Sequence, residues 1–263
     1  FDPGLQLTQQ ATDVRVQAGG DIAVASVRNA GYAEAVKENT LGNGLAIAGL
    51  DGGARLLLQS AAASIAYAGT PQRVEQDRGE VLGAVLPERL QVFAPQGSIS
   101  MNPTGSSYQQ PTDQATTQLL AGHDLTLGRL EVLAAGPAAP LGTQDRQTMD
   151  AQLRSGRLAN RAGLLDTSTR EPVQLLAYSG DVSLLNLLAS ARPVRVQAGR
   201  DIAFGRSASI EVQHQHSNVQ LVQLHELSLL QAGRDIVFSA NSTTPHLEIA
   251  GPGDLMLLAG RDI

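Results

Sequence analysis

The chain has no cysteine and no tryptophan, and aromatic residues make up only 3% of its 263 residues. Without cysteine there is no disulfide scaffold, no thiolate nucleophile and no cysteine-ligated zinc. No uninterrupted apolar run approaches the roughly 20 residues that a membrane-spanning helix needs. Charged residues are also scarce, at 17%, and a formal net charge of -6 argues against a nucleic-acid partner.

Aliphatic residues and glycine are abundant instead. Hydrophobic residues reach 42% and there are 27 glycines, which is enough for a sizeable core and argues against disorder. With so few aromatic rings, that core must consist of valine, leucine, isoleucine and alanine, which suit a narrow and regular interior. The chain starts at Phe1 and stops at Ile263 inside a repeated motif, so we interpret it as an internal piece of a longer protein.

One short motif recurs along the chain. In its clearest copies an alternating apolar run leads to alanine, glycine and aspartate, and a second alternating run follows. These copies are VRVQAGGDIAV (14–24), VRVQAGRDIAF (194–204), LLQAGRDIVF (229–238) and LMLLAGRDI (255–263), with looser copies at 56–67, 92–101, 119–127 and 175–185. Alternation is typical of half-buried β-strands, so each copy predicts two strands joined by a corner.

The copy at residues 194–204 shows what each position is expected to do. Its valines should face the core, while Arg195 and Gln197 face solvent. The glycine would let the corner adopt a positive φ without steric penalty. Asp201 would accept backbone N–H groups across the corner, and Ile202 beyond it should turn inward again.

The spacing of the corner aspartates predicts the architecture. Asp181, Asp201, Asp235 and Asp262 follow one another at intervals of 20, 34 and 27 residues. A variable period of this size fits the rungs of a parallel β-helix, where each strand pairs with its copies about 4.8 Å above and below. The general preference for right-handed crossovers favours a right-handed helix. The alternative is a β-sandwich, although sandwiches do not repeat one corner motif at one strand position.

Three stretches interrupt the repeat within what we expect to be a single β-helix segment over residues 1–263. Residues 102–117 are interpreted as a polar loop insertion. Residues 142–172 are interpreted as an insertion with a helix, because good helix formers run from 144 to 165. Residues 32–39 should form one or two short helical turns. Such insertions often carry the binding face of a repeat protein, but solvated loops without a partner have the same composition.

The AGRDI corner after an alternating strand resembles the repeats of the filamentous haemagglutinin family. The matching positions are 18–22, 198–202, 232–236 and 259–263, with looser matches between them. Members are very large exoproteins exported by two-partner secretion across the bacterial outer membrane, and they include adhesins and the stick-like proteins of contact-dependent growth inhibition. The resemblance implies a right-handed parallel β-helix, a secreted or cell-surface location, and an outer-membrane transporter as export partner. The family shares no catalytic residues, so the resemblance implies none here.

Two clusters have residue types suited to chemistry, but neither has the required pattern. His214 and His216 share one strand face and, with Glu211 and His225, offer zinc-ligand types without a second ligand pair at fixed spacing. The run RVEQDRGE (73–80) would be the seat of a polysaccharide-cleaving activity, yet its alternating charges indicate a solvated loop. The corner aspartates are too sparse for a calcium-binding repeat. We therefore expect no metal, no cofactor and no enzyme.

The expected function is non-enzymatic binding. As a monomeric segment of a secreted adhesin, the chain would contribute to binding a receptor or glycan on another cell. A structural stalk or spacer is the alternative hypothesis, and a polysaccharide-cleaving enzyme is the third. The non-repetitive insertions favour binding over spacing, and a tyrosine among small polar residues suits adaptable recognition. The expected contact residues are Tyr108, Gln109, Gln110, Arg154 and Arg157.

Overall fold

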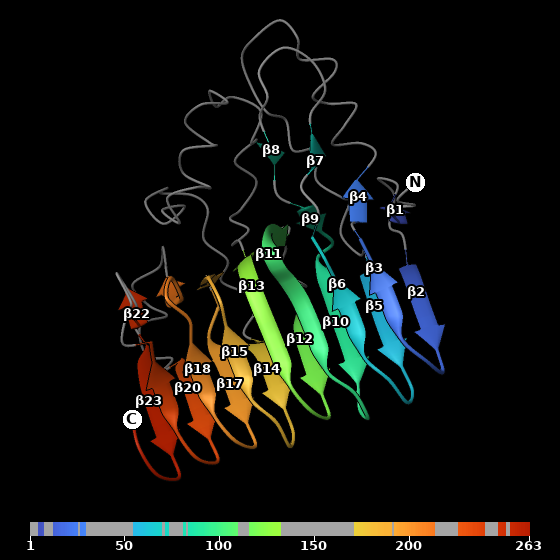
Figure 1. Ribbon diagram of the computed structural model, residues 1–263. Helices are drawn as coiled ribbons and strands as arrows, with labels where there is room; N and C mark the ends of the chain where they lie inside the picture. Colours follow the sequence, from blue (N-terminus) through green and yellow to red (C-terminus); the bar gives the residue numbers. More distant parts are fainter. Residues whose placement is uncertain are drawn as a thin grey trace, which may run out of the picture.

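The computed structural model describes the chain in thirteen ranges, and regular structure in them is entirely β-strand (Figure 1). The ranges are 5–7, 13–25, 27–29, 55–69, 72–73, 81–82, 84–109, 116–132, 171–190, 192–213, 226–239, 247–250 and 253–263. Within them, no helix is long and apolar enough to cross a bilayer. The expected helical segments at 32–39 and 144–165 lie outside the described residues.

Eight parallel strands form the first sheet, and their order across the sheet is their order along the chain. They are β2 (Asp13–Ala18), β5 (Arg55–Ser60), β10 (Arg89–Ala94), β12 (Thr116–Ala121), β14 (Val173–Ala177), β17 (Val194–Ala198), β20 (Leu227–Ala232) and β23 (Asp254–Ala259). Figure 1 shows them side by side, running from blue to red. Each strand therefore pairs with the preceding and following copies of the repeat.

Eleven strands form the second sheet, which is also parallel. Seven lie in one row: β3 (Ile22–Val24), β6 (Ile65–Tyr67), β11 (Ile99–Gln109), β13 (Leu125–Val132), β15 (Val182–Leu184), β18 (Ile202–Phe204) and β21 (Ile236–Phe238). Beside the later halves of β11 and β13 lie β9 (Ala84–Leu86), β16 (Leu187–Ser190), β19 (Ser209–Gln213) and β22 (Leu247–Ala250).

Two short pairs lie outside these sheets. β1 (Leu5–Leu7) pairs with β4 (Val27–Asn29) in parallel, and β7 (Gln72–Arg73) pairs with β8 (Val81–Leu82) in antiparallel fashion. The main chain otherwise alternates between the two large sheets. We call a rung one first-sheet strand together with the second-sheet strands that follow it. The prediction of an all-β fold of parallel strands is confirmed for the described residues.

The core lies between the sheets and consists of columns of side chains contributed by successive rungs. In the second sheet one column is formed by the isoleucine, leucine and valine residues Ile22, Ile65, Ile99, Leu125, Val182, Ile202 and Ile236, each at most 5% exposed. Two of the few aromatic residues, Phe204 and Phe238, stack in the neighbouring column with ring centroids 4.5 Å apart. The expected alternation in β17 is confirmed, because its three apolar residues are buried and Arg195 is exposed.

The motif corner is the turn from a first-sheet strand into the second sheet. Its glycine is needed for a different reason than the sequence suggested. Among the described glycines only Gly69 has a positive φ, so the expectation of left-handed glycines at the motif corners is wrong. The constraint is the close stacking of rungs. A Cβ at Gly233 would collide with the carbonyl oxygen of Gly199, and one at Gly260 would collide with that of Gly233.

The corner aspartates link successive rungs, and we call the series Asp124, Asp181, Asp201, Asp235 and Asp262 the aspartate ladder. Oδ1 of Asp124 accepts the backbone N–H of Asp181 at 2.9 Å. The same bond joins each later pair, at 3.0, 3.1 and 3.2 Å. The prediction that these aspartates accept backbone N–H groups is thus confirmed, but the prediction that they do so across their own corner is wrong, because the amide belongs to the next rung.

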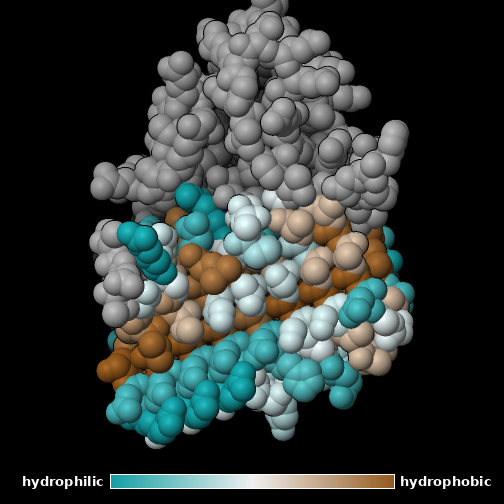
Figure 2. All heavy atoms as spheres, in the orientation of Figure 1, coloured by the Kyte–Doolittle hydropathy of each residue, from teal (hydrophilic) through white to brown (hydrophobic). Residues whose placement is uncertain are grey.

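Arginines reinforce the aspartate ladder in the last three rungs. Arg200 binds Asp181 through both Nε and Nη2, at 3.1 and 2.8 Å. The same paired geometry recurs between Arg234 and Asp201 and between Arg261 and Asp235. Figure 2 shows hydrophilic side chains gathered in a band along this edge. The AGRD motif is therefore one unit in which glycine permits stacking while arginine and aspartate join neighbouring rungs.

The loop prediction for residues 102–117 is wrong over 102–109 and again at 116–117, where β12 begins, and 110–115 lie outside the described residues. Residues 102–109 belong to β11, which pairs with β13 and β9. Asn102 adopts a left-handed conformation with φ of 51°, and it bends the strand between the two rows of the second sheet. Its buried amide accepts a hydrogen bond from Ser107 at 2.9 Å and donates one to the carbonyl of Arg129 at 3.2 Å. Polar residues here satisfy one another inside the fold, which is why their composition resembled that of a loop.

Candidate functional site

The return corner, where the chain passes from the second sheet back to the first, is where three long interruptions attach. Residues 110–115, 133–170 and 214–225 each follow a strand of the second sheet and precede a strand of the first. The strands before them lie close together in one sheet, because β11 pairs with β13 and β13 is connected through β16 to β19. The interruptions therefore leave the sheets along one edge of the molecule.

A buried hydrogen-bond network joins the bases of two of these interruptions. We call Glu88, Gln109, Thr117 and Arg192 the corner network, and each is at most 3% exposed. Gln109 Nε2 donates to the carbonyl of Glu88 at 2.6 Å and to the carbonyl of Thr116 at 2.9 Å. Because Thr116 is the first described residue after 110–115, the Gln109 side chain bridges the two ends of that segment.

The network continues to the base of residues 133–170. Thr117 Oγ1 donates to Gln109 Oε1 and accepts from Arg192 Nη2 at 2.9 Å. Arg192 Nη1 then donates to the carbonyl of Glu171 at 3.2 Å, the first described residue after that segment. A single chain of bonds therefore fixes the exit from one interruption relative to the other. Buried networks of this kind hold a defined geometry because an unmade bond in them is costly.

A second polar feature lies beside the return corner on β13. Glu131 is 1% exposed and forms an ion pair with Arg129, at 2.6 Å from Nη2 to Oε1. Burial raises the pKa of Glu131 to about 7, the Arg129 charge opposes that rise, and Glu211 adds to it. Glu131, Ala189, Glu211 and Glu248 are in register on neighbouring strands, so three carboxylates share one column.

This column does not make a metal centre. Among the described residues, no group of three or more histidine, aspartate or glutamate side chains is placed to bind a metal ion. Of the zinc candidates only Glu211 lies in the described ranges, on β19, and His214, His216 and His225 lie outside them. The charged run 73–80 also lies outside them, apart from the backbone of Arg73 in β7.

Two of the five expected contact residues, Tyr108 and Gln109, lie in the described ranges. Gln109 was expected on an exposed loop, but it is fully buried in the corner network, so that expectation is wrong. Tyr108 lies in β11, where it pairs with Val85 and Glu131. Gln110, Arg154 and Arg157 lie outside the described residues.

Sequence reasoning missed Thr117, Arg192 and Glu131. Thr117 occupies an inward position in β12, paired with the buried Leu90 of β10. A polar residue at an inward position of an alternating strand was the signal that could have found it. Arg192 and Glu131 gave no such signal, because burial of a charged side chain depends on neighbours from other rungs.

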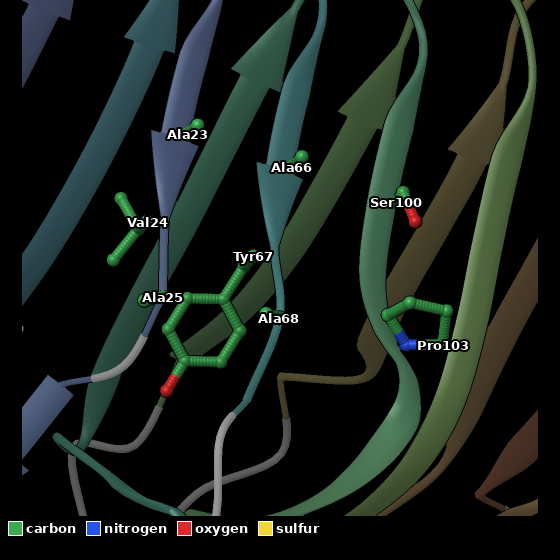
Figure 3. A pocket seen from close by; sticks show the side chains of 8 residues that line it. All are labelled: Ala23, Val24, Ala25, Ala66, Tyr67, Ala68, Ser100 and Pro103. Atoms are coloured by element: carbon green, nitrogen blue, oxygen red, sulfur yellow. The ribbon is translucent and has the colours of Figure 1, made fainter. Parts of the chain in front are cut away.

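A shallow pocket of about 400 Å³ lies on the outer face of the second sheet near the N-terminal rungs (Figure 3). Its lining includes Ala23, Ala66, Ser100 and Pro103, with Tyr67 beside them. None of the described residues that line it is charged, so this lining offers little chemistry beyond apolar contact.

No family model, curated protein or solved structure matches the chain. The residues and their geometry are accordingly the basis for inferring its function.

Proposed function

We propose that the chain is a right-handed parallel β-helix segment of a large secreted bacterial surface protein, and that it contributes non-enzymatically to binding a receptor or glycan on another cell. The two parallel sheets, with strand order equal to chain order, support a β-helix because each rung then stacks on the one before it. Right-handedness follows the general preference of parallel crossovers. The resemblance of the AGRDI corners to filamentous haemagglutinin repeats supports the surface location and export through an outer-membrane transporter.

The observation that carries the binding function is the shared return corner. Three interruptions of the repeat, at 110–115, 133–170 and 214–225, attach along one edge of the sheets, and the corner network fixes the bases of two of them. A spacer gains nothing from presenting its irregular segments together. Binding proteins do gain, because variable segments held on a rigid scaffold form one recognition surface.

A stalk or spacer is the second candidate, and the aspartate ladder favours it. The ladder joins every rung from β12 to β23 by the same bond, which suits a rigid rod. The stalk hypothesis therefore explains the regular corner, whereas the binding hypothesis explains the opposite one.

The test is saturable binding of the fluorescently labelled chain to intact bacterial and host cells, measured by flow cytometry. In one variant a short Gly/Ser linker replaces residues 133–170, which attach at the return corner. In the matched control the same linker replaces residues 240–246, which join β21 to β22 elsewhere. We expect binding to be lost only in the first variant. Absence of saturable binding to every cell type, or equal loss in both variants, would overturn the binding function in favour of the stalk.

A further inference from the structure

The motif corner of the β14 rung departs from the repeat. Five of the eight motif corners have two residues between the end of the first-sheet strand and the corner aspartate, whereas the β14 corner has three, between Ala177 and Asp181. The other two corners of this length, in the β5 and β10 rungs, carry the small residues Ala61 and Pro95 at the first position. The β14 corner carries Tyr178 there, in a chain with only four tyrosines.

Tyr178 is held in place by its backbone while its side chain projects into solvent. Its N–H donates to the carbonyl of Ala121 at 2.9 Å, and Gly199 of the next rung packs against its carbonyl oxygen. Its exposure is 78%, the highest among the large apolar and aromatic side chains that the structure describes. An aromatic ring that contributes so little to the core, on a fixed backbone, is suited to contact with a ligand.

His123 of the preceding rung lies beside this corner. Its Nδ1 is 3.1 Å from Ser179 Oγ, and Ser179 Oγ is 2.6 Å from the carbonyl oxygen of Gly122. In the tautomer that carries the proton on Nδ1, the Ser179 hydroxyl can donate to Gly122 while it accepts from His123, and Nε2 is then an acceptor. The exposed imidazole in that tautomer offers an acceptor for a hydroxyl group.

Asp124 differs from the other members of the aspartate ladder that are followed by a later rung, because its ion pair with Arg200 involves only one of its two carboxylate oxygens. The two bonds it accepts both end on Oδ1, from the Asp181 N–H at 2.9 Å and from Arg200 Nη2 at 3.2 Å. In Asp181, Asp201 and Asp235 an arginine of the next rung binds the second oxygen as well. In the β14 rung the residue immediately before the ladder aspartate is Gly180 instead of an arginine, so Oδ2 of Asp124 has no hydrogen bond from the described chain, and its side chain is 53% exposed.

We propose that Tyr178, His123 and Asp124, which we call the corner patch, bind a neutral hexose of a glycan. The apolar C–H face of a sugar ring stacks on an aromatic ring, whose face carries negative charge density. Sugar hydroxyls supply the donors that Asp124 Oδ2 and His123 Nε2 require. A carboxylate on the ligand would lie close to that of Asp124, so acidic sugars fit less well. The proposal rests on the proposed function and names its ligand class, at a corner separate from the return corner.

Saturation-transfer NMR of the full chain with methyl glycosides of glucose, galactose, mannose and N-acetylglucosamine tests this proposal, with glucuronic and sialic acids as acidic probes. At least one neutral glycoside should give transfer that the acidic sugars do not. Tyr178→Ala should reduce that transfer by about tenfold or more, and Tyr178→Phe should retain most of it because the ring remains. Asp124→Asn should also weaken it, whereas Asp262→Asn, a ladder residue without a neighbouring tyrosine, should not.

Two results would overturn the glycan site. One is the absence of transfer from every sugar, and the other is equal transfer in the wild type and Tyr178→Ala. Cell binding that survives Tyr178→Ala and periodate treatment of the cells, but is lost when residues 133–170 are replaced, would point to a protein receptor at the return corner. That outcome rejects the corner patch and leaves the proposed function standing.

Discussion

At the scale of single residues, position on the inner or outer face should decide how a substitution affects stability. Ile202 is 0% exposed in the column of second-sheet side chains, and Arg195 faces solvent from β17. Ile202→Asp places an unpaired carboxylate in an apolar interior, and we expect a loss of stability of about 4 kcal/mol or more, or failure to fold. Arg195→Asp should change stability by only about 0.5 kcal/mol.

Thermal and urea unfolding of both variants provide the measurement. Circular dichroism at room temperature should already separate them if Ile202→Asp does not fold. Similar midpoints for Ile202→Asp and Arg195→Asp would contradict the assignment of inner and outer faces in these strands.

Glu131 should make stability depend on pH. Its pKa rises from 4.5 in the unfolded chain to about 7 in the fold, because burial outweighs the attraction of Arg129. The native state therefore holds a proton that the unfolded state releases, and stability should fall as pH rises from 4.5 to 7. Glu131→Gln removes this penalty, which corresponds to about 3 kcal/mol at pH above 7.

Urea unfolding between pH 4 and pH 8 tests this expectation. Glu131→Gln and the wild type should be similar at the acidic end, and the variant should become the more stable protein above pH 7. A constant difference between Glu131→Gln and wild type across the range would show that the carboxyl titrates normally.

At the scale of the element, we expect glycine to be required at the motif corner because successive rungs stack closely there, and not because of its backbone conformation. A Cβ at Gly233 would collide with the Gly199 carbonyl of the rung below, whereas one at Gly20 would meet nothing within 4 Å. We expect Gly233→Ala to destabilise the protein by about 1–3 kcal/mol. Gly20→Ala should be neutral or slightly stabilising because it only restricts the unfolded chain. Equal destabilisation by the two substitutions in urea unfolding would contradict close stacking of rungs as the reason for glycine at this corner.

The stability that the aspartate ladder contributes should depend more on the aspartate carboxylate than on the arginine that binds it. Asp201→Ala removes the acceptor for the Asp235 amide, and we expect a cost of about 1–3 kcal/mol. Arg234→Gln removes an ion pair whose arginine is 43% exposed, so its cost should stay below about 1 kcal/mol. Asp201→Asn keeps an acceptor oxygen and should lie between them. A larger cost for Arg234→Gln than for Asp201→Ala would contradict this order.

Asp201 should also contribute to the loss of stability at acid pH. Burial alone would raise the pKa of Asp201, but the Asp235 amide and Arg234 together hold it below its ordinary value of 3.8. Its contribution to stability is therefore complete above that value and is lost as pH falls through the lowered pKa. In acid titrations of unfolding, Asp201→Ala should lose less stability below pH 4 than the wild type does.

The repeated motif could be recognised in the sequence, but the physical role of each of its residues could be deduced only in part. The alternation of apolar and polar residues located β17 and β18, because the inward or outward direction of a side chain depends only on its position in its own strand. The role of Asp201 as an acceptor followed from its chemistry, but the identity of its donor did not, because that amide lies 34 residues away in the next rung. The glycines were misinterpreted for the same reason, as the collision partner belongs to another rung.

At the scale of the whole molecule, the parallel all-β arrangement could be predicted because it follows from a repeated motif, whereas the candidate site could not. The corner network joins Gln109 to Thr117, and it joins Thr117 to Arg192 across 75 residues of sequence. Each of these residues taken alone reads as solvated or loop-like. Their burial becomes visible only when the rungs are stacked, so local composition placed residues 102–109 in a loop and not in β11.

Stacking also determines how substitutions in different rungs should combine. Each rung contacts its neighbours, so stability should approximate a sum of rung and nearest-neighbour contributions. Ile202 and Ile236 are paired in adjacent rungs, whereas Ile65 lies in the same column but is separated from Ile236 by several rungs. In double-mutant cycles of Ile→Ala substitutions, the adjacent pair should show a coupling of about 0.5 kcal/mol or more.

The distant pair, Ile65 with Ile236, provides the matched control because both residues are buried isoleucines of one column. Its two effects should add within about 0.5 kcal/mol in urea unfolding. Equal coupling in both cycles would mean that the core responds as one globular unit. Coupling confined to adjacent rungs would instead show that a disturbance at one corner stays local, so that the return corner and the corner patch act as independent surfaces on one scaffold.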